Sequence, residues 1–434
     1  MNFYRHSVVL DVEKCMGCTT CARRCPTEAI RIQDGHANIN TDRCIDCGEC
    51  IRVCPHNAKK AMCSKFEHYL DYKWKIALPA PALFGQFDGL EDVDEVLQGL
   101  LDIGFDDVFE VAKAAELVSS YTRMFLKTEG IKKPVISSAC PVISRLISLR
   151  FPYLKDNILP ILPPMEIAAM LAKEKAKKEH PELSDADIGV FFISPCAAKV
   201  SYIRNGYGDY KSNVDVVISL NDIYFMLIGV MKRKNAPQIS SQAGMIGIGW
   251  ASSGGESSAI LNDSYLAADG IENCIQVLES IENGNIPQLE FVELNACISG
   301  CVGGVMTIEN PFIAKTRLQS VRRYLPVSRN FVPNENAYIP IEYITDSLPS
   351  YTPISRLSDN MGESMRMMAK IQELRRTLPG IDCGACGSPT CRAFAEDIVR
   401  GLVTQERKCI VLEQKKSDES NDIKENSDDC SADN

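Results

Sequence analysis

The chain carries nineteen cysteines in 434 residues, and sixteen of them fall into three groups of motifs, of which the first and the last are closely spaced. Thiols in such number require a chemical reason. Disulfide bonds are the usual one in secreted proteins, but the Cys-x-x-Cys spacings repeat too tightly for a disulfide framework. The first residues, MNFYRHSVV, also contain no apolar signal segment. We therefore expect metal-ligating thiols in a reducing cytoplasm.

Eight of these cysteines form two runs with the same spacing, Cys-x-x-Cys-x-x-Cys-x-x-x-Cys-Pro, near the start of the chain. Bacterial ferredoxins with two clusters share this spacing, and there the fourth cysteine of each run ligates the other cluster. Zinc is the alternative metal, but zinc motifs lack the third cysteine and the Cys-Pro ending. The sequence therefore predicts two 4Fe-4S clusters, one on Cys15, Cys18, Cys21 and Cys54 and the other on Cys44, Cys47, Cys50 and Cys25.

A third set follows near the C-terminus, in the segment IDCGACGSPTCRAFAEDIVRG and beyond it. Its members are Cys383, Cys386, Cys391 and Cys409. The spacing resembles that of a 4Fe-4S module found in some electron-transfer and corrinoid-linked proteins, and a helix over about 390–402 would return the last thiol to the others. Four cysteines alone do not choose the metal, so zinc stays open here. With iron, the module would be a second electron port or a redox element that a partner reads.

Composition excludes several classes of function. Hydrophobic residues make up 45% of the chain and charged residues 24%, as in globular proteins, and no apolar run is long enough to span a bilayer. The formal net charge is -10, which argues against a nucleic-acid surface because phosphate contacts need clustered Lys and Arg. We expect neither a nucleic-acid partner nor a membrane partner.

Between the N-terminal and C-terminal cysteine sets, apolar runs alternate with helical patterns. The runs cover 74–83, 133–140, 187–195 and 289–297, and the helical patterns lie near 90–102, 165–179 and 221–233. This alternation predicts an α/β fold with mainly parallel sheets and flanking helices. Three of the four runs end in or just before a cysteine, so we expect those thiols at the C-terminal ends of strands, where α/β proteins place their sites.

Changes in composition along the sequence predict that the chain has four parts. Residues 1–64 form a small α+β ferredoxin-like domain, and 65–355 form the α/β domain. Residues 356–413 form a linker helix, which stops at Pro379 and Gly380, and a small helical cluster module. The segment 414–434 is acidic and nearly without apolar residues, so we expect it to be disordered.

Three segments of the α/β domain, SSACP (137–141), SPCAAK (194–199) and ELNACISGCVGG (293–304), together resemble the signature segments of FeFe-hydrogenase large subunits. The resemblance covers roughly 75–325 and includes the Gly-rich stretch GIGWASSGGES (247–257). It implies an H-cluster, a 4Fe-4S cluster joined to a two-iron unit that carries CO and CN ligands. The implied cluster ligands are Cys140, Cys196, Cys297 and Cys301, and Cys301 would bridge to the two-iron unit.

The resemblance also assigns a role to Lys199, three residues after Cys196. The family places a lysine there that donates a charge-assisted hydrogen bond to a cyanide ligand. Glu293 lies four residues before Cys297, where it could orient the loop or make an ordinary cap or salt bridge.

Several positions depart from the family pattern. Prototypical members carry a proton-relaying cysteine just before the first ligand, where this chain has Ala139. Of two relay glutamates, the second aligns with Glu116 and the first with Lys113, so Glu116 is the remaining candidate for proton transfer. Pocket methionines are replaced by Ser194 and Asn295, and a serine is replaced by Ala82. Together these departures resemble the sensory FeFe-hydrogenases, above all group D and also group C.

The resemblance thus implies a cytoplasmic iron-sulfur oxidoreductase that interconverts H2 with protons and electrons at low turnover. Its redox partner would be a ferredoxin or a signalling protein, and hydrogenase maturases would supply the two-iron unit. One alternative is a multi-cluster electron-transfer or iron-sulfur assembly protein that never receives this unit, although Lys199 disfavours it. Another is a fully catalytic enzyme that bypasses Ala139 through water or Glu116.

Overall fold

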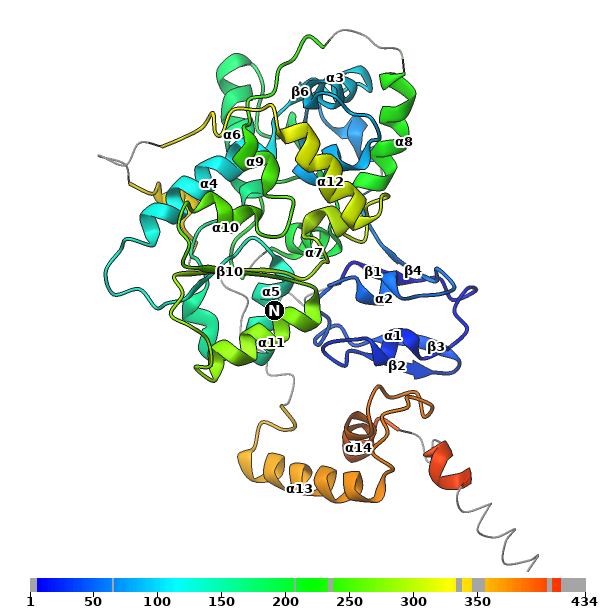
Figure 1. Ribbon diagram of the computed structural model, residues 1–434. Coiled ribbons are helices and arrows are strands. Elements are labelled where there is room, and N and C mark those ends of the chain that lie inside the picture. Colours follow the sequence, from blue (N-terminus) through cyan, green and yellow to red (C-terminus); the bar gives the residue numbers. More distant parts are fainter. Residues whose placement is uncertain are drawn as a thin grey trace, which may run out of the picture. The chain divides into compact units, whose positions relative to one another are not determined.

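The computed structural model describes two compact units, and each is treated by itself (Figure 1). The described residues are 6–64, 66–206, 208–232, 237–332, 338–345, 356–403 and 408–414. The larger unit comprises Met1–Val9, Ile45–Gly48 and Ala61–Tyr351, and the smaller comprises Leu10–Cys44, Glu49–Lys60 and Thr352–Asn434. All but the first residue of the expected acidic tail 414–434, including Cys430, lies outside the described residues.

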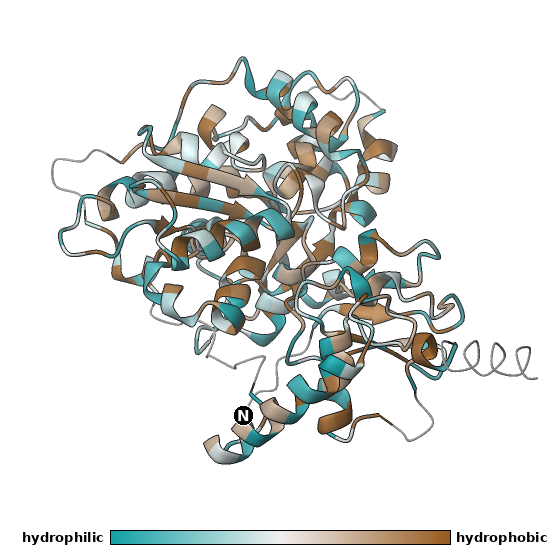
Figure 2. Ribbon diagram, turned by 60° about the horizontal axis from the view of Figure 1, so that its bottom comes forward, coloured by the Kyte–Doolittle hydropathy of each residue, from teal (hydrophilic) through white to brown (hydrophobic). Residues whose placement is uncertain are grey.

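A four-stranded parallel sheet forms the first half of the larger unit. Its order is β6 (Asp107–Val108), β5 (Trp74–Pro79), β8 (Ile188–Ser194) and β9 (Val216–Ser219). All seven residues of β8 are buried, because helices cover both faces of a parallel sheet. Figure 2 shows apolar residues along the strands, and apolar and hydrophilic residues alternating along the helices.

A second parallel sheet, of three strands, forms the other half. Its order is β10 (Tyr265–Asp269), β11 (Phe291–Asn295) and β7 (Val135–Ile136). β11 is central, with Phe291 opposite both Tyr265 and Val135. The predicted α/β class with mainly parallel sheets is confirmed, and all four predicted apolar runs contain a strand.

Helices and 3-10 turns connect and cover these strands. The α-helices are α3 (Val93–Asp102), α4 (Val111–Phe125), α5 (Pro141–Arg150), α6 (Pro164–Glu179), α7 (Ala197–Asn205), α8 (Leu220–Met231), α9 (Met245–Gly249), α10 (Gly255–Ala259), α11 (Ile271–Glu282) and α12 (Pro311–Arg322). The 3-10 turns are η1 (Phe66–Asp71), η2 (Pro81–Gln86), η3 (Pro152–Asn157), η4 (Cys301–Gly303) and η5 (Ile341–Tyr343). Asp92 begins α3 with a capping box to Glu95. The three helices predicted from the sequence correspond to α3, α6 and α8.

The ferredoxin-like region has short elements around its cysteines. They are β1 (Val8–Leu10), α1 (Thr20–Arg23), β2 (Ile30–Gln33), β3 (His36–Ile39), α2 (Glu49–Arg52) and β4 (Lys59–Ala61). β2 and β3 form an antiparallel hairpin, and β1 pairs with β4. The hydrophobic cluster of the smaller unit is small and includes thiols, with Cys21 packed on Ile30 and Ala37. Bound clusters would therefore replace much of an ordinary core.

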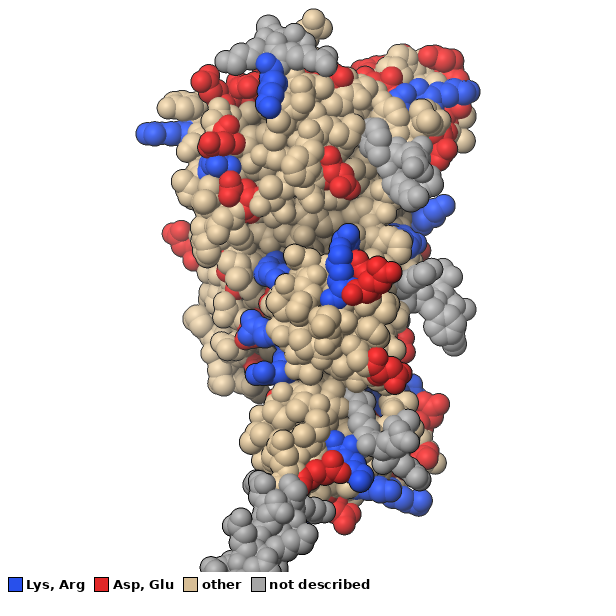
Figure 3. All heavy atoms as spheres, turned by 90° about the vertical axis from the view of Figure 1, so that its right-hand side faces the viewer, with Lys and Arg blue, Asp and Glu red and all other residues tan. Residues whose placement is uncertain are grey.

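Two further helices belong to the smaller unit. α13 (Met361–Thr377) begins at the cap residue Asn360 and ends just before Pro379, as predicted. α14 (Cys391–Val399) begins at Thr390, whose hydroxyl accepts a hydrogen bond from the Ala393 amide. No helix among the described residues is long and apolar enough to cross a membrane. On the face shown in Figure 3, acidic and basic side chains are interspersed among uncharged residues.

Candidate iron-sulfur and hydrogenase site

The two N-terminal cysteine runs repeat their backbone geometry as well as their spacing. Three residues of the first run adopt left-handed conformations, and each has a left-handed counterpart 29 positions later. The pairs are Gly17 and Asp46, Thr19 and Gly48, and Glu28 and Asn57. In each half a thiol also accepts a backbone hydrogen bond, from Ala29 to Cys25 at 3.2 Å and from Ala58 to Cys54 at 3.3 Å. Such bonds stabilise a thiolate in place as a ligand.

The structure brings together the four thiols predicted for the first cluster. Burial raises the pKa of the Cys21 thiol, and the charges of Cys18, Cys15 and Cys54 raise it further. Lys59 opposes that rise. Its own side chain is 3% exposed, and its amine has no hydrogen-bond partner among the described residues. This buried cation is a feature that the cysteine spacing could not indicate.

The four C-terminal cysteines also converge. Cys383, Cys386, Cys391 and Cys409 line one small cavity together with apolar side chains that include Leu378 and Phe394. Cys391 begins α14, and its amide donates to Asp382 at 2.6 Å. The four thiols thus lie together in the structure, and the site they would form stays a prediction.

In the larger unit, four thiols reach one cavity from the carboxyl ends of strands. Cys140 follows β7 and precedes α5, and Cys196 follows β8 and precedes α7. Cys297 follows β11, and Cys301 begins η4. Strands of both sheets therefore position thiols at the cavity. The thiols that precede α5 and α7 lie at helix N-termini, where the helix dipole favours a thiolate.

Two glycines allow these loops to approach one another. Gly300 has φ +86°, and a methyl group added there would lie 2.5 Å from the Ser253 nitrogen. A methyl group at Gly304 would lie 2.2 Å from the carbonyl oxygen of Pro195. Only glycine fits such contacts, which hold the turn of Cys301 against the segment of Ser253 and against the loop of Cys196.

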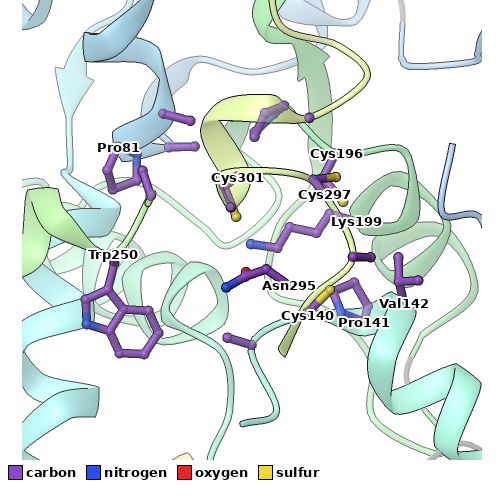
Figure 4. A pocket seen from close by; sticks show the side chains of 18 of the residues that line it. Pro81, Cys140, Pro141, Val142, Cys196, Lys199, Trp250, Asn295, Cys297 and Cys301 are labelled. Carbon is purple, nitrogen blue, oxygen red and sulfur yellow. The ribbon is translucent and has the colours of Figure 1, made fainter. Parts of the chain in front are cut away.

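Lys199 lines the cavity together with the four cysteines. Figure 4 shows the four sulfur atoms around this space and the Lys199 amine reaching toward Cys301 and Asn295. Burial raises the pKa of the Cys196 thiol, and the neighbouring thiols add to the rise while Lys199 opposes it. Burial likewise raises the pKa of Cys301, again opposed by Lys199. A buried thiol is costly to ionise when no metal is bound. Metal binding would offset that cost, so the four thiols would release their protons and bind as thiolates.

Family models match the three cysteine regions separately. The model of the iron-only hydrogenase large subunit, C-terminal domain, matches 73–266 and 255–305, which is more than half of the chain. A 4Fe-4S dicluster domain matches 7–55, and an Fe-S cluster domain matches 378–410. This chain belongs to the iron-only, or FeFe, hydrogenase family.

A curated relative and several solved structures are similar to parts of this family member. The periplasmic Fe hydrogenase large subunit of Nitratidesulfovibrio vulgaris is 30% identical over 213 residues, which is 45% of this chain and 50% of the relative. The match thus spans half the length of that relative. A variant of FeFe-hydrogenase HydA1 from Chlamydomonas reinhardtii has a TM-score of 0.44 at 17% identity, covering 73% of this chain and 91% of the other. HydA(deltaEFG), solved in a study of stepwise H-cluster assembly, gives the same score and identity over 58% and 86%.

The positions that depart from the hydrogenase pattern are distributed as follows. Ala82, Ala139 and Asn295 line the cavity. Ser194 is buried at the end of β8, where its hydroxyl accepts a hydrogen bond from the Cys196 amide at 3.1 Å. It therefore fixes the loop that carries Cys196.

Glu116 does not line the cavity that holds the thiols. Its carboxylate is buried and accepts hydrogen bonds from the amides of Gly244 at 2.6 Å, Arg329 at 2.9 Å and Asn330 at 2.9 Å. It also accepts from the Ser328 hydroxyl at 3.0 Å. This arrangement anchors two loops on α4, so the relay role of Glu116 stays a prediction beside a structural role that the contacts support.

A pair of buried carboxyl groups in the cavity wall was only partly foreseen. Glu256 and Glu293 both line the cavity. Burial, followed by the charge of Glu293, raises the pKa of Glu256 to about 8. The Glu256 carboxyl accepts a hydrogen bond of 2.6 Å from Ser137, and the Ser137 oxygen accepts the Ala139 amide at 3.1 Å. A carboxyl group able to hold a proton near neutral pH thus lies one side chain away from Ala139.

Glu293 is fixed more firmly than Glu256. It accepts hydrogen bonds from the amides of Gly254 at 3.0 Å and Ser257 at 2.8 Å, and from Asn295 at 2.7 Å. Two of these contacts are with amides at the N-terminus of α10, as in the helix-cap role left open for Glu293, and the contact with Asn295 fixes the strand end before Cys297. The role of Glu256 could not be predicted from its distance in sequence to the cysteines, because Glu256 reaches the cavity from α10.

The donor set fits clusters rather than one isolated ion. Within the described ranges, no three His, Cys, Asp or Glu side chains converge on a single metal-ion position. The four cavity thiols instead surround a space, and the Lys199 amine places a positive charge in its wall. Soft thiolates and a cation that can face anionic ligands suit an iron-sulfur cluster joined to a cyanide-bearing group.

Proposed function

We propose that this protein is a sensory-type FeFe-hydrogenase, which interconverts H2 with protons and electrons slowly and passes its redox state through 4Fe-4S clusters. One observation carries the proposal: four thiols and Lys199 share a cavity whose wall has Ala139 where a proton-carrying side chain would lie. The cavity supports an H-cluster, and Ala139 supports low turnover.

The residues that would hold the group follow from the cavity. Cys140, Cys196, Cys297 and Cys301 would bind the cubane, with Cys301 also facing the two-iron unit. When bound, that group would supply the site for binding and heterolytic cleavage of H2. Lys199 would orient the two-iron unit with its ammonium group. Hydrogenase maturases would deliver this unit.

Electrons would leave the cavity through the N-terminal clusters. Asp46 and Cys47, which belong to the second cysteine run, line the same cavity as the four thiols. We therefore expect Cys47 to be the cluster ligand through which electrons leave the cavity. A ferredoxin or a signalling protein would exchange electrons with the chain.

Protons would move through the carboxyl group nearest to Ala139. Glu256 can hold a proton on its carboxyl oxygen near neutral pH, and the Ser137 hydroxyl bonded to it can pass that proton onward. Proton transfer along this route would be slow, because a serine hydroxyl rather than an acidic side chain would be the group nearest to the site.

Restoring a proton carrier at position 139 tests the sensory part. Ala139→Cys should raise H2 oxidation and evolution about 10-fold or more, because general acid-base groups typically contribute at least that much. The matched control is Ser138→Cys, since the Ser138 hydroxyl donates to the Ile161 carbonyl rather than lining the cavity. Equal rates in A139C and the parent would instead favour the alternative enzyme that bypasses Ala139.

A further inference from the structure

The C-terminal cysteine module packs on the ferredoxin-like hairpin within the smaller unit. The Arg31 guanidinium donates to Asp397 at 2.6 Å, and Arg43 pairs with Glu396. All four side chains are 14% exposed or less. Breaking a buried ion pair from one side leaves an uncompensated charge, so these pairs fix where α14 lies.

Backbone and hydroxyl contacts fix the loop between the module's cysteines. The Ile32 amide of β2 donates to the Gly387 carbonyl at 2.8 Å. The Thr390 hydroxyl donates to Glu28 at 3.0 Å. The segment between Cys386 and Cys391 is therefore attached along the free edge of the β2–β3 hairpin.

Loops that carry predicted ligands of two different clusters touch directly. A methyl group added at Gly384 would lie 3.0 Å from Cγ of Arg23 and 3.5 Å from the Thr19 hydroxyl. Gly384 follows Cys383, and Thr19 follows Cys18. Ligand loops in van der Waals contact would place their clusters close enough for direct electron transfer.

The charge around the first N-terminal cluster suits an electron acceptor. Lys59 is buried, lacks a hydrogen-bond partner among the described residues, and acts electrostatically on Cys21. A buried cation stabilises the more negative, reduced state of a nearby cluster.

We propose that the C-terminal cluster exchanges single electrons directly with the cluster of Cys15, Cys18, Cys21 and Cys54, which makes the C-terminal module the outer station of the electron chain. A one-electron carrier protein reduces the C-terminal cluster by one electron. That electron then passes to the first N-terminal cluster, and in H2 oxidation the direction reverses. The inference rests on the clusters of the proposed function but not on the two-iron unit.

Spin coupling between the clusters provides the test. We expect the EPR spectrum of the dithionite-reduced full chain to show magnetic interaction that involves the C-terminal cluster. Arg31→Glu combined with Arg43→Glu should remove this interaction while the iron content stays unchanged. Adding Glu396→Arg and Asp397→Arg should restore it, because the ion pairs are then reversed rather than lost.

One variant serves as the control, and two results would contradict the inference. Arg356→Glu makes the same change of charge at an exposed residue that pairs with Asp359 and is far from every cysteine in sequence, and it should leave the spectrum unchanged. Persistence of the interaction in the R31E/R43E variant with full iron content would overturn the inference. So would a C-terminal module that contains zinc or no metal. Neither result affects the H-cluster, whose own failure would appear as missing CO and CN infrared bands.

Discussion

The proposed proton route depends on a single residue, Glu256. Its pKa of about 8 means that the carboxyl group is protonated below that pH and ionised above it. H2 evolution needs the protonated form, so its rate should fall as the pH rises through about 8. Glu256→Gln should lower the rate by about 100-fold and remove this inflexion, because the amide cannot release a proton.

The control for this prediction is Glu279→Gln, a surface glutamate that pairs with Arg150. Its pH profile should match that of the parent. An E256Q variant with unchanged rate and unchanged inflexion would exclude Glu256 from the proton route. The measurement is H2 evolution from a reduced dye between pH 6 and pH 9.

Residues differ in how far the sequence could predict them. The thiols and Lys199 could be predicted because each lies in a short local motif, such as Cys-x-x-Cys or Pro-Cys-Ala-Ala-Lys, even where one set of ligands comes from several strand ends. Glu256 could not be assigned in this way, since it meets Ser137 across 119 positions of sequence. Lys59 lies outside every cysteine spacing, and only folding shows that its amine is buried.

At the scale of elements, the close approach of the η4 turn to the loop after β8 decides whether the cavity forms. Gly304→Ala would place a methyl group 2.2 Å from the Pro195 oxygen, so we expect a loss of about 3 kcal/mol of stability. Iron should be lost from the cavity while both N-terminal clusters remain. Thermal unfolding and iron analysis with EPR would measure these effects.

Gly229→Ala is the matched control, because Gly229 lies inside α8 with nothing within 4 Å of an added methyl group. This change should stabilise the helix by about 1 kcal/mol. A G304A variant that is as stable and as rich in iron as G229A would contradict the packing argument.

Secondary structure followed from periodicity for β5, β8, β11 and the longer helices, because buried parallel strands are continuous apolar runs. The division into two parallel sheets could not be foreseen, since strand order depends on contacts such as that of Val135 with Phe291, far apart in sequence. The same limit applies to the strand ends, where β7 is only two residues long.

At the scale of the whole molecule, the contacts in the structure divide the chain at different positions from those predicted from changes in sequence composition. The C-terminal module shares a unit with most of the ferredoxin-like region, although more than 290 residues separate them. The pairs responsible, such as Arg31 with Asp397, are ordinary charged residues in the sequence, and nothing local marks them as partners. Family membership and the α/β class, by contrast, were predictable from motifs within single segments.

In the proposed function, the cavity around Lys199 holds a two-iron unit with CO and CN ligands. Infrared spectroscopy of the full chain, produced anaerobically with the hydrogenase maturases, tests it most directly. We expect bands where metal-bound CO and CN stretch, and we expect them to shift under H2. A protein with its iron-sulfur clusters intact but without such bands would contradict the account and would be a multi-cluster electron carrier on a hydrogenase fold.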